Sequence, residues 1–541
     1  MSAKKATKGS KKGLLIIVAA VVVVLGLVGA GVYFVLNSAP KGIQVAVSTL
    51  PDSLNPVLEQ NTSGLNADEL LFDGLCNFEV DETSGRLYTD FALAESIEQD
   101  PKTKVDYTVI LRADALWHDG NPVTADDVVY SFQAYTNEEN NSPKRDYIMS
   151  FIESVDAVDA ATVHIKFVNP LPEFRAYPVL AGFKIIPSRY NGQDMDVNMR
   201  AGENERKFAT APIGTGPFKL ATWELGKWLT FESNLAYFKQ VPAAESLVIK
   251  RTIDPVVRMN EMRRGRTNFI LETNPMDRKT VSQMKGVDIQ SYLPYAFYQV
   301  AINFDHFPRK DGRKAMAMAL NKEKLIPGIT DQDKGIIINN GPFPSNLYSS
   351  NIPEYRDEPM DNLLPYDLAT AKELAEKNGI SGQSTILIYP DSMGEFGTQL
   401  AEGIAKQLSA IGLNVETKRT GDQVYNRMVY KEKSYELALM YCEGFDNVYS
   451  SIGDWYTSKG QFNVTGLADK DLDKLLDNWS KVVETTEWIK LTDQVNEKIS
   501  DLSPNLFLCS LEKDVYSRGL SNVAIATDNP FLSVEYWKFG K

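Results

Sequence analysis

Hydrophobic and polar residues alternate along the chain with two different periods, and the pattern predicts a mixed α/β protein. Short runs rich in β-branched residues and bounded by turn residues predict strands at residues 43–47, 107–111, 162–167, 229–232 and 247–250. Hydrophobic residues spaced three or four positions apart predict helices at residues 65–75, 255–264 and 311–325. Strands and helices mixed in this way along one chain are typical of an α/β architecture.

The segment between residues 367 and 441 carries the most regular pattern. Helices are predicted there at 367–378, at 394–411 and from Asp422, and they alternate with strands at 384–389, 414–418 and 436–441. A β-α-β-α-β order predicts a layer of parallel strands joined by right-handed crossovers. Because ligands of such sheets bind beyond the carboxyl ends of the strands, the residues after position 441 are candidates for a binding site.

One uncharged segment near the N-terminus stands apart from this pattern. Residues 14–36 are 23 residues without a charged side chain, and five lysines precede them: Lys4, Lys5, Lys8, Lys11 and Lys12. A helix of this length is roughly 34 Å long and can cross a hydrocarbon core of about 30 Å. We interpret it as an uncleaved transmembrane signal anchor, with a cytoplasmic basic tail at residues 1–13 and the bulk of the chain outside the cell membrane. A long cleaved signal peptide is the alternative.

Composition narrows the class of partner and of chemistry. The 541 residues exceed one compact core and predict two to four folding units. The net charge of −14 argues against nucleic acid as a partner, because a phosphate backbone requires a basic surface. The sequence contains no GxSxG, no HExxH and no metal-ligand spacing of Cys and His, so it predicts no enzyme, no metal and no cofactor. Three cysteines allow one disulfide at most, and whether Cys442 and Cys509 pair stays open.

His118 and Asp119 resemble catalytic apparatus, but their surroundings have a simpler interpretation. They lie in LWHDGNPVTADDVVYSF, residues 116–132, where Asp-Gly predicts a turn. Thr124, with Asp127 three positions later, predicts a capping box at the start of a helix. A catalytic His requires a nucleophile and an orienting acid that converge on it, and this segment supplies neither. We therefore interpret His118 as a turn residue.

The other histidines and a basic cluster also lack a catalytic arrangement. His164 falls at a half-exposed position of the strand predicted at 162–167, and His306 falls in a predicted surface loop. Arg263, Arg264 and Arg266 close the helix predicted at 255–264, where basic residues complement the helix dipole. We interpret these arginines as solvated residues of a helix C-terminus.

The segment at 116–132 also resembles the signature of a known family. A strand, then Leu-Arg, then a Trp near an Asp-Gly turn, then PVTADDV is similar to the extracellular solute-binding proteins of family 5. These are the peptide- and nickel-type ligand receptors of ABC importers. Further blocks resemble the family in the same order along the chain: SLNPV (53–57), ELLFDGLCNF (69–78), LYTDFALAESIE (87–98), IGTGPFKL (213–220) and DGRKAMAMALNKEKLI (311–326). Together the blocks extend the resemblance over residues 43–541.

The resemblance implies a two-lobed, periplasmic-binding-protein-like α/β fold of the cluster C type, with an extra α+β domain. After the transmembrane helix at 14–36, the first lobe is expected at residues 43–80, 184–268 and 500–541. The extra domain is expected at 81–183 and the second lobe at 269–499. In such a fold a ligand binds in the cleft between the lobes, and the lobes close around it by a hinge motion.

The binding residues are expected after the strand at 436–441, where the chain departs from the family pattern. In peptide-binding members the corresponding strand ends in Gly-Trp-x-x-Asp-Tyr, whose Asp binds the amine of the peptide. The resemblance implies ligand-binding residues at Tyr441, Cys442, Glu443, Gly444, Phe445, Asp446 and Trp455. Here Gly444 takes the place of the Asp. Because a buried ammonium requires a paired anion, either Glu443 or Asp446 replaces it, or the ligand is not a standard free peptide.

The expected function is therefore that of an extracytoplasmic solute-binding protein of an ABC importer. Its expected partners are a peptide or similar small-molecule ligand, the ABC permease subunits and, through the N-terminal helix, the membrane. Two alternatives use the same fold: a membrane-anchored ligand sensor or receptor, and a protein that binds a non-peptide solute such as a sugar or a nickel chelate.

Overall fold

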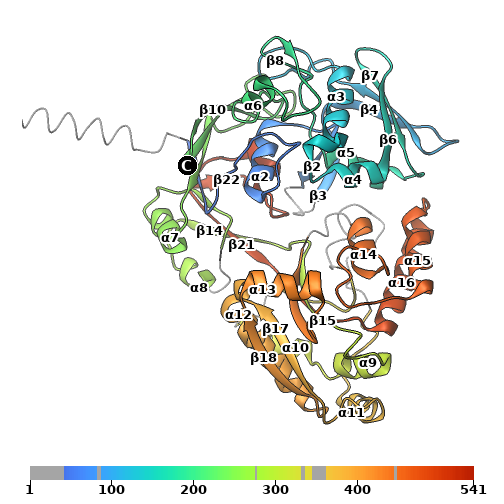
Figure 1. The fold of residues 1–541 in the computed structure, drawn as a ribbon. Coiled ribbons are helices and arrows are strands. Elements are labelled where there is room, and N and C mark those ends of the chain that lie inside the picture. The colour runs from blue at the N-terminus through green and yellow to red at the C-terminus, as the bar shows by residue number, and fades with distance from the viewer. Residues whose placement is uncertain are drawn as a thin grey trace, which may run out of the picture.

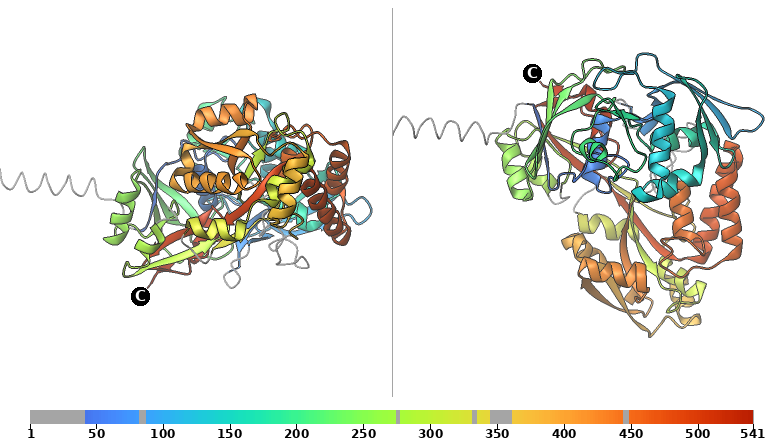
Figure 2. Two further views of the ribbon diagram at one scale, coloured as in Figure 1. Left: turned by 90° about the horizontal axis from the view of Figure 1, so that it is seen from below. Right: turned by 45° about the horizontal axis from the view of Figure 1, so that its top comes forward.

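The computed structural model describes residues 42–81, 87–273, 277–330, 335–343, 361–443 and 448–540. These residues form two lobes placed end to end, and a further domain packs beside the first lobe (Figure 1). The same placement is visible when the molecule is turned (Figure 2, right).

The first lobe is built on a mixed sheet of seven strands among the described residues. Their order is β10 (Phe218–Glu224), β11 (Trp228–Ser233), β12 (Ser246–Arg251), β1 (Ile43–Val47), β13 (Phe269–Ile270), β21 (Lys513–Arg518) and β14 (Val287–Tyr292). Helix α2 (Thr62–Leu71) covers one face, and α7 (Pro255–Arg263) and α8 (Arg278–Val281) cover the other. Strand β1 alternates between them: Ile43 and Val45 enter the core with α2, and Ala46 enters the core with α7 and α8.

The second lobe is built on a sheet of six strands in the part of the chain that the structure describes. Their order is β16 (Ile336–Ile338), β20 (Asn505–Leu511), β15 (Phe297–Ile302), β19 (Leu437–Cys442), β17 (Ser384–Pro390) and β18 (Asn414–Thr420). Strand β17 pairs in parallel with both β18 and β19, which confirms the parallel layer predicted from the β-α-β-α-β pattern. Leu437 and Leu439 enter one core and Ala438 and Met440 enter another, so β19 is buried on both faces. This burial explains its uninterrupted hydrophobic run.

Helices cover both faces of this second sheet. One core contains residues of α9 (Lys310–Met318), α10 (Lys322–Thr330), α11 (Leu368–Lys377) and α12 (Gly394–Ser409). The other contains residues of α13 (Asp422–Asn426), α14 (Val448–Tyr456), α15 (Lys470–Lys481) and α16 (Thr485–Leu502). The single helix predicted at 311–325 is wrong, because α9 ends before Ala319 and α10 begins after Asn321. The Asn321 side chain accepts a hydrogen bond from the Lys324 amide and so starts a new helix.

The extra domain is an antiparallel sheet with helices on one side. Its strands follow the order β4 (Ala94–Gln99), β5 (Asp106–Leu111), β7 (Thr162–Phe167) and β6 (Ile152–Ala157). Its helices are α3 (Ala125–Thr136), α4 (Arg145–Phe151) and α5 (Glu173–Ala181), and the short α6 (Glu203–Phe208) follows them. Val109 and Val163 of this sheet belong to the same buried cluster as Val45 and Phe218 of the first lobe. The extra domain and the first lobe therefore share one core.

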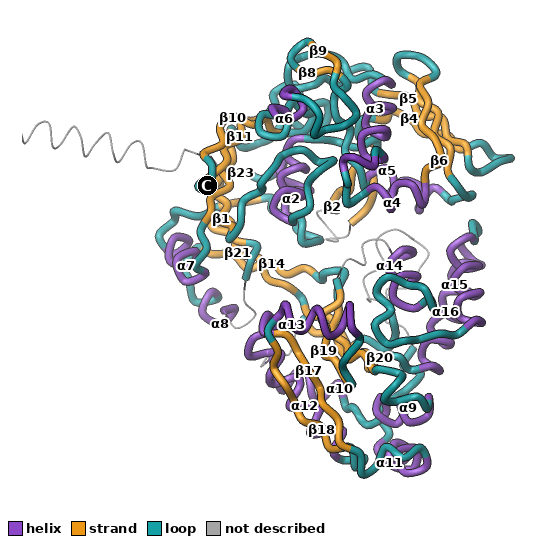
Figure 3. The backbone as a smooth tube through the Cα atoms, in the orientation of Figure 1, coloured by secondary structure: helices purple, strands orange, loops and turns teal. Residues whose placement is uncertain are grey.

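The chain passes between the lobes twice, at neighbouring places. Strand β14 ends at Tyr292 and β15 begins at Phe297, and β20 ends at Leu511 and β21 begins at Lys513. Because β14 pairs with β21 in the first sheet and β15 pairs with β20 in the second, the connections at 293–296 and 512 lie side by side (Figure 3).

Sheet membership differs from three of the predicted domain boundaries. Strands β13 and β14 belong to the sheet of the first lobe, although they fall within the range 269–499 predicted for the second lobe. Strand β20 belongs to the sheet of the second lobe, although it falls within 500–541. The hairpin of β2 (Cys76–Val80) and β3 (Leu87–Phe91) also spans the predicted boundary at 80/81. Two short hairpins are also present: β8 (Arg189–Tyr190) with β9 (Gln193–Asp194), and β22 (Leu520–Ser521) with β23 (Lys538–Phe539).

The segment around His118 forms a corner between the extra domain and the first lobe. The His118 amide donates to the carbonyl of Gly214 at 2.7 Å, and its Nδ1 accepts from the Gly214 amide at 3.1 Å. Its Nε2 lies 3.1 Å from the carbonyl of Gly216. A side chain at Gly214 would meet the Leu71 carbonyl at 1.7 Å, so this turn requires glycine. His118 therefore holds a turn together, and the capping box of Thr124 and Asp127 is present at the start of α3 as predicted.

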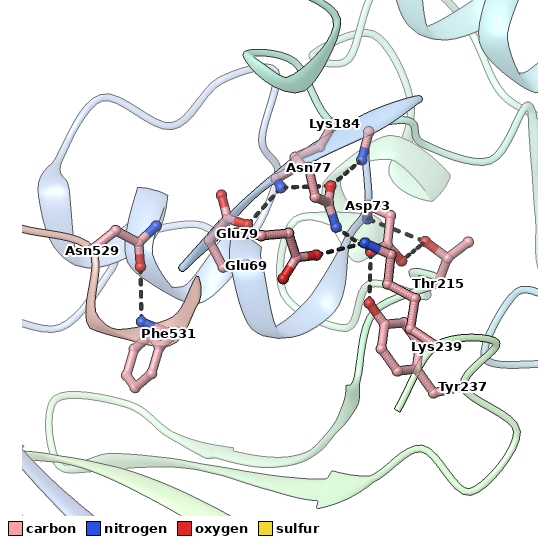
Figure 4. A network of polar contacts seen from close by, with 11 residues as sticks. Glu69, Asp73, Asn77, Glu79, Lys184, Thr215, Tyr237, Lys239, Asn529 and Phe531 are labelled. Carbon is pink, nitrogen blue, oxygen red and sulfur yellow. Dashed lines mark hydrogen bonds and ion pairs between the residues drawn. The ribbon is translucent and has the colours of Figure 1, made fainter. Parts of the chain in front are cut away.

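A buried polar network joins the same corner to the rest of the first lobe (Figure 4). The carboxylate of Asp73, which is inaccessible to solvent, accepts hydrogen bonds from Asn77 at 2.6 Å, Thr215 at 2.7 Å and Tyr237 at 3.0 Å. Ion pairs of Lys184 with Glu69 and of Lys239 with Glu79 flank it. A buried carboxylate with three donors stabilises the fold, whereas the same group without donors would destabilise it.

The predicted membrane span at 14–36 lies outside the described residues. Among the residues that are described, no helix has the length and the apolar character needed to cross a membrane.

The environment of His118 predicts how this residue responds to pH. Burial lowers the pKa of His118 from 6.5 to about 4. Since Nδ1 accepts a hydrogen bond, the neutral ring carries its proton on Nε2. Between pH 6.5 and about 4 the unfolded chain takes up a proton here and the native protein does not, so this residue lowers stability as the pH falls. In ¹⁵N NMR spectra the His118 ring should remain the neutral Nε2-H tautomer at pH 5, and a titration near pH 6.5 would contradict this prediction.

Candidate functional site

The carboxyl ends of the parallel strands of both lobes point toward the crossing. In the first lobe, β21 starts at the crossing and runs away from the second lobe. Strand β13 is antiparallel to β21, and β1 and β12 run parallel to β13, so these three strands run toward the second lobe. In the second lobe, β15 starts at the crossing and runs away from the first lobe. Strand β19 is antiparallel to β15, and β17 and β18 run parallel to β19, so these three strands run toward the first lobe. Open α/β sheets bind ligands beyond the carboxyl ends of their strands. The topology therefore places the candidate binding edges of both lobes beside the crossing.

On the first lobe, Glu272 joins the ends of the parallel strands. Its carboxylate accepts from the Ser48 amide at 2.9 and 3.1 Å, and Ser48 follows β1 directly. Arg258 forms an ion pair with Glu272 at 3.3 Å and donates to the carbonyl of Thr252, which follows β12. Glu272 remains on the surface, where it presents an acidic side chain on the edge that faces the second lobe.

A charged group lies at the crossing itself. The Asp528 carboxylate accepts a hydrogen bond from the Tyr292 hydroxyl at 2.5 Å and pairs with Lys513 at 2.8 Å. The Lys513 ammonium also lies 5.5 Å from the centre of the Tyr441 ring, within range of a cation–π contact. Tyr292 and Lys513 are the first-lobe residues nearest the two connections, and Tyr441 belongs to the second lobe. This cluster therefore joins the lobes at the crossing.

A row of aromatic rings continues from this cluster into the second lobe. The Tyr441 ring lies 4.9 Å from the Tyr298 ring, and the Tyr298 ring lies 5.0 Å from the Phe396 ring in the first turn of α12. The Tyr441 hydroxyl is buried and has no hydrogen-bond partner among the described residues. Burial, and then the carboxylates of Asp528 and Glu443, raise the pKa of Tyr441 well above its usual value. Its hydroxyl is therefore a neutral donor at the edge where the lobes meet.

The structure brings only some of the predicted site residues to this edge. Tyr441 is half-buried beside Lys513, and Glu443 is exposed directly after β19. Cys442 points the other way: it is buried, and its Sγ accepts a hydrogen bond from the Gln299 side chain at 3.1 Å. Trp455 belongs to the same buried cluster and packs against Phe462 at 5.6 Å. These two residues support the core in this structure. Gly444, Phe445 and Asp446 lie outside the described residues.

All three cysteines are buried and free. Cys442 is paired with Phe297 and Cys509 with Tyr298, so strand β15 lies between the two strands that carry these thiols. Strands are about 4.8 Å apart, which places the two cysteines roughly 9–10 Å apart, beyond the span of a disulfide. The order of the strands thus excludes a disulfide between Cys442 and Cys509, which the sequence alone leaves open.

Several residues of this edge carry no recognisable sequence motif: Glu272, Tyr292, Tyr298, Phe396, Lys513 and Asp528. One signal points to Lys513, because it follows the buried strand run at 505–511 almost directly, as a residue at the end of a strand does. The others come from segments that are far apart in sequence, and only the sheet topology brings them together. Among the described residues, no three His, Cys, Asp or Glu side chains gather closely enough to hold a metal ion.

Two α/β lobes joined by a double crossing, with binding edges that face each other, define the architecture of periplasmic-type binding proteins. The sequence profile of the bacterial extracellular solute-binding proteins, family 5 middle, matches residues 91–463. The chain belongs to this family of solute-binding proteins, as the sequence motifs predicted.

Individual relatives agree with this assignment. The chain is 27% identical over 446 residues to di/tripeptide-binding protein 2 of Pseudomonas aeruginosa, which covers 77% of each chain. Its fold is similar to that of the ABC transporter substrate-binding protein CtaP of Listeria monocytogenes, with a TM-score of 0.80 and 21% identity over 92% of this chain and 99% of that one. It is also similar to NikZ of Campylobacter jejuni, solved with Ni(L-His), with a TM-score of 0.73 and 20% identity over 92% and 100% of the two chains.

The Tyr441 hydroxyl, for which no described residue is a hydrogen-bond partner, gives a test of this description. Replacing Tyr441 by Phe should leave the free energy of unfolding within about 0.5 kcal/mol of the original, because the hydroxyl makes no hydrogen bond to a described residue. Replacing it by Ala should lower that free energy by about 2 kcal/mol, because the contacts with Tyr298 and Lys513 are lost. Urea unfolding of the two variants measures both values. Equal destabilisation by Phe and Ala would show that the hydroxyl has a partner.

Proposed function

We propose that this protein is the solute-binding component of an ABC importer and that it binds a peptide between its two lobes. The observation that carries the proposal is the direction of the strands: the carboxyl ends of the parallel strands of both lobes converge on the crossing. A ligand there contacts both lobes at once, so its binding free energy can hold the lobes together. Because the closed form differs in shape from the open form, a permease can distinguish the ligand-bound protein from the free one.

The short connections support a hinge motion. One lobe reaches the other through residues 293–296 and through Glu512, and the second lobe has its own cores on both faces of its sheet. Rotation about two neighbouring segments changes few backbone angles and leaves these cores intact.

The chemistry of the edge fits a peptide better than an uncharged solute. Acidic side chains stand on both sides, Glu272 on the first lobe and Glu443 on the second, and either can receive an ammonium group. The rings of Tyr441 and Tyr298 provide an apolar surface for side chains of the ligand. The Pseudomonas relative is named for di- and tripeptides, which supports the same ligand class. We propose that Glu443 or Asp446 takes the place of the family Asp that Gly444 replaces.

We also propose that residues 14–36 anchor the chain in the cell membrane, with the described residues on the extracytoplasmic side. The support is the uncharged length of this segment and the lysines that precede it.

Purified protein should bind peptides. A peptide at a hundredfold excess over its Kd should raise the free energy of unfolding by about 2.7 kcal/mol, visible as a higher melting temperature. Peptide pools, sugars and nickel–histidine should be compared, with native mass spectrometry to identify any ligand that co-purifies. Stabilisation by a sugar or by nickel–histidine, and by no peptide, would replace the proposed ligand class.

If Glu443 binds the amine, Glu443→Gln should weaken the binding of a free peptide by about tenfold to a hundredfold. The binding of the same peptide with an acetylated N-terminus should change little. Asp446→Asn tests the other acid, and Glu416→Gln, an exposed acid on β18, is the matched control. Calorimetry gives the dissociation constants. An unchanged preference for the free amine in both Glu443→Gln and Asp446→Asn would exclude this role for either acid.

An anchored chain should keep residues 14–36 and should resist extraction from membranes by alkaline carbonate. Intact mass and subcellular fractionation of the full-length protein measure both properties. A mature chain that begins after residue 36 and appears in the medium would show that the segment is a cleaved signal peptide.

A further inference from the structure

A group of basic residues forms an open pocket on the outer side of the first lobe. The pocket has a volume of about 450 Å³ and is lined by Arg263, Thr280, Gln283, Met284, Lys285 and Arg518. Arg264 and Arg266 continue the positive surface beyond the end of α7, and both are exposed. We call Arg263, Arg264, Arg266, Lys285 and Arg518 the basic patch. Helices α7 and α8, which border it, lie on the side of the first lobe away from the extra domain (Figure 1).

The charges of the basic patch are not neutralised within the protein. Among the described residues, none of its five members forms an ion pair with an acidic side chain; the polar contacts they make are to Asn260 and to the Lys285 carbonyl. Neighbouring basic residues are paired, as in Lys250 with Glu261 and Arg278 with Asp514. The chain as a whole carries a net charge of −14, so a cluster of positive charges without acidic partners has the opposite sign to the net charge of the protein. A solvated surface of this kind fits an anionic partner.

The basic patch lies close to the first residues of β1. Asn268 accepts from the Gln44 amide at 2.9 Å, and its own side chain donates to the Arg518 carbonyl at 3.1 Å. The Asn268 side chain therefore bridges the backbone of Arg518 and the backbone of Gln44, near the beginning of β1. That end of β1 points away from the second lobe, because β1 runs toward the crossing. The patch thus lies where the described chain begins.

Little chain separates this point from the proposed membrane anchor. The uncharged segment ends at residue 36, and the described residues begin at Gly42. Residues 37–41 can span at most about 20 Å even when fully extended. An anchored first lobe is therefore held within a short distance of the lipid headgroups, with its basic patch beside the attachment point.

We propose that the basic patch docks on the phosphate headgroups of anionic phospholipid in the membrane that anchors the chain. This inference rests on the proposed anchor. The tether raises the local concentration of lipid, so individually weak contacts between arginine and phosphate suffice. Docking orients the first lobe with its β1 end toward the bilayer and the crossing away from it, which leaves the second lobe free to move.

The test uses the full-length chain in nanodiscs. A thiol is introduced at the exposed residue Ser282, beside the pocket, and labelled with a donor dye; the native cysteines are buried. The acceptor is a dye on lipid headgroups. Energy transfer should be higher in nanodiscs that contain phosphatidylglycerol than in those of phosphatidylcholine, and it should fall with added salt. Replacing Arg263, Arg264 and Arg266 by Gln should lower the docked fraction by about tenfold or more.

A matched variant controls for net charge. Replacing the exposed residues Lys372, Lys406 and Lys418 of the second lobe by Gln removes the same charge and should leave the transfer unchanged.

Transfer that does not depend on lipid charge, or that survives the triple arginine substitution, would overturn the proposal; an acidic protein as the true partner would give this result. If the chain is not retained in the nanodiscs, the anchor fails and the docking fails with it. Retention without charge-dependent transfer refutes the docking alone.

Discussion

Everything in this structure depends on how the chain passes between its lobes. The backbone crosses twice, and hydrogen bonds of the same two antiparallel pairs hold the crossings together: β14 with β21 in one sheet and β15 with β20 in the other. This pairing fixes the direction of the other strands. Once β21 and β15 are set, the parallel strands of each lobe must end toward the other lobe, and the residues that follow those ends must share one region. The candidate binding edge is thus a consequence of strand pairing.

The same crossing divides the described residues into parts with separate cores. The extra domain and the first lobe share a core, and the second lobe has cores of its own. Away from the crossing, the extra domain touches the second lobe through Lys104 with Glu484 at 3.3 Å and through Arg175, which donates to the Ser480 carbonyl at 2.7 Å. The proposed rotation about the crossings would break these contacts and leave the cluster of Tyr292, Lys513 and Asp528 in place. The Lys104–Glu484 pair is exposed, and exposed ion pairs contribute little to stability, so this pair alone adds little to the free energy that holds the extra domain against the second lobe.

Sequence patterns captured what local physics determines. The period of two and the parallel layer identified β1, β7 and β17–β19, and the capping box at Thr124 identified the start of α3. The resemblance built on these blocks agreed with the family. The lobe boundaries were less accurate, because the second crossing uses the single residue Glu512 and leaves no loop in the pattern. Of the predicted site residues, Tyr441 and Glu443 lie at the edge, whereas Cys442 and Trp455 face the core. The contact of Tyr292 with Asp528 required the topology, since these two residues are 236 positions apart in the sequence.

The central claim is that a ligand closes the two lobes about the crossing. Single-molecule energy transfer between dyes on Lys102→Cys, in the extra domain, and Thr486→Cys, at the start of α16, measures it directly, since these exposed positions flank the contact of Lys104 with Glu484. The account predicts that a bound peptide shifts the population toward the short distance seen in this structure, and that Glu443→Gln or Asp446→Asn reduces the shift at a given peptide concentration. Peptide binding that leaves the distribution of distances unchanged would contradict it.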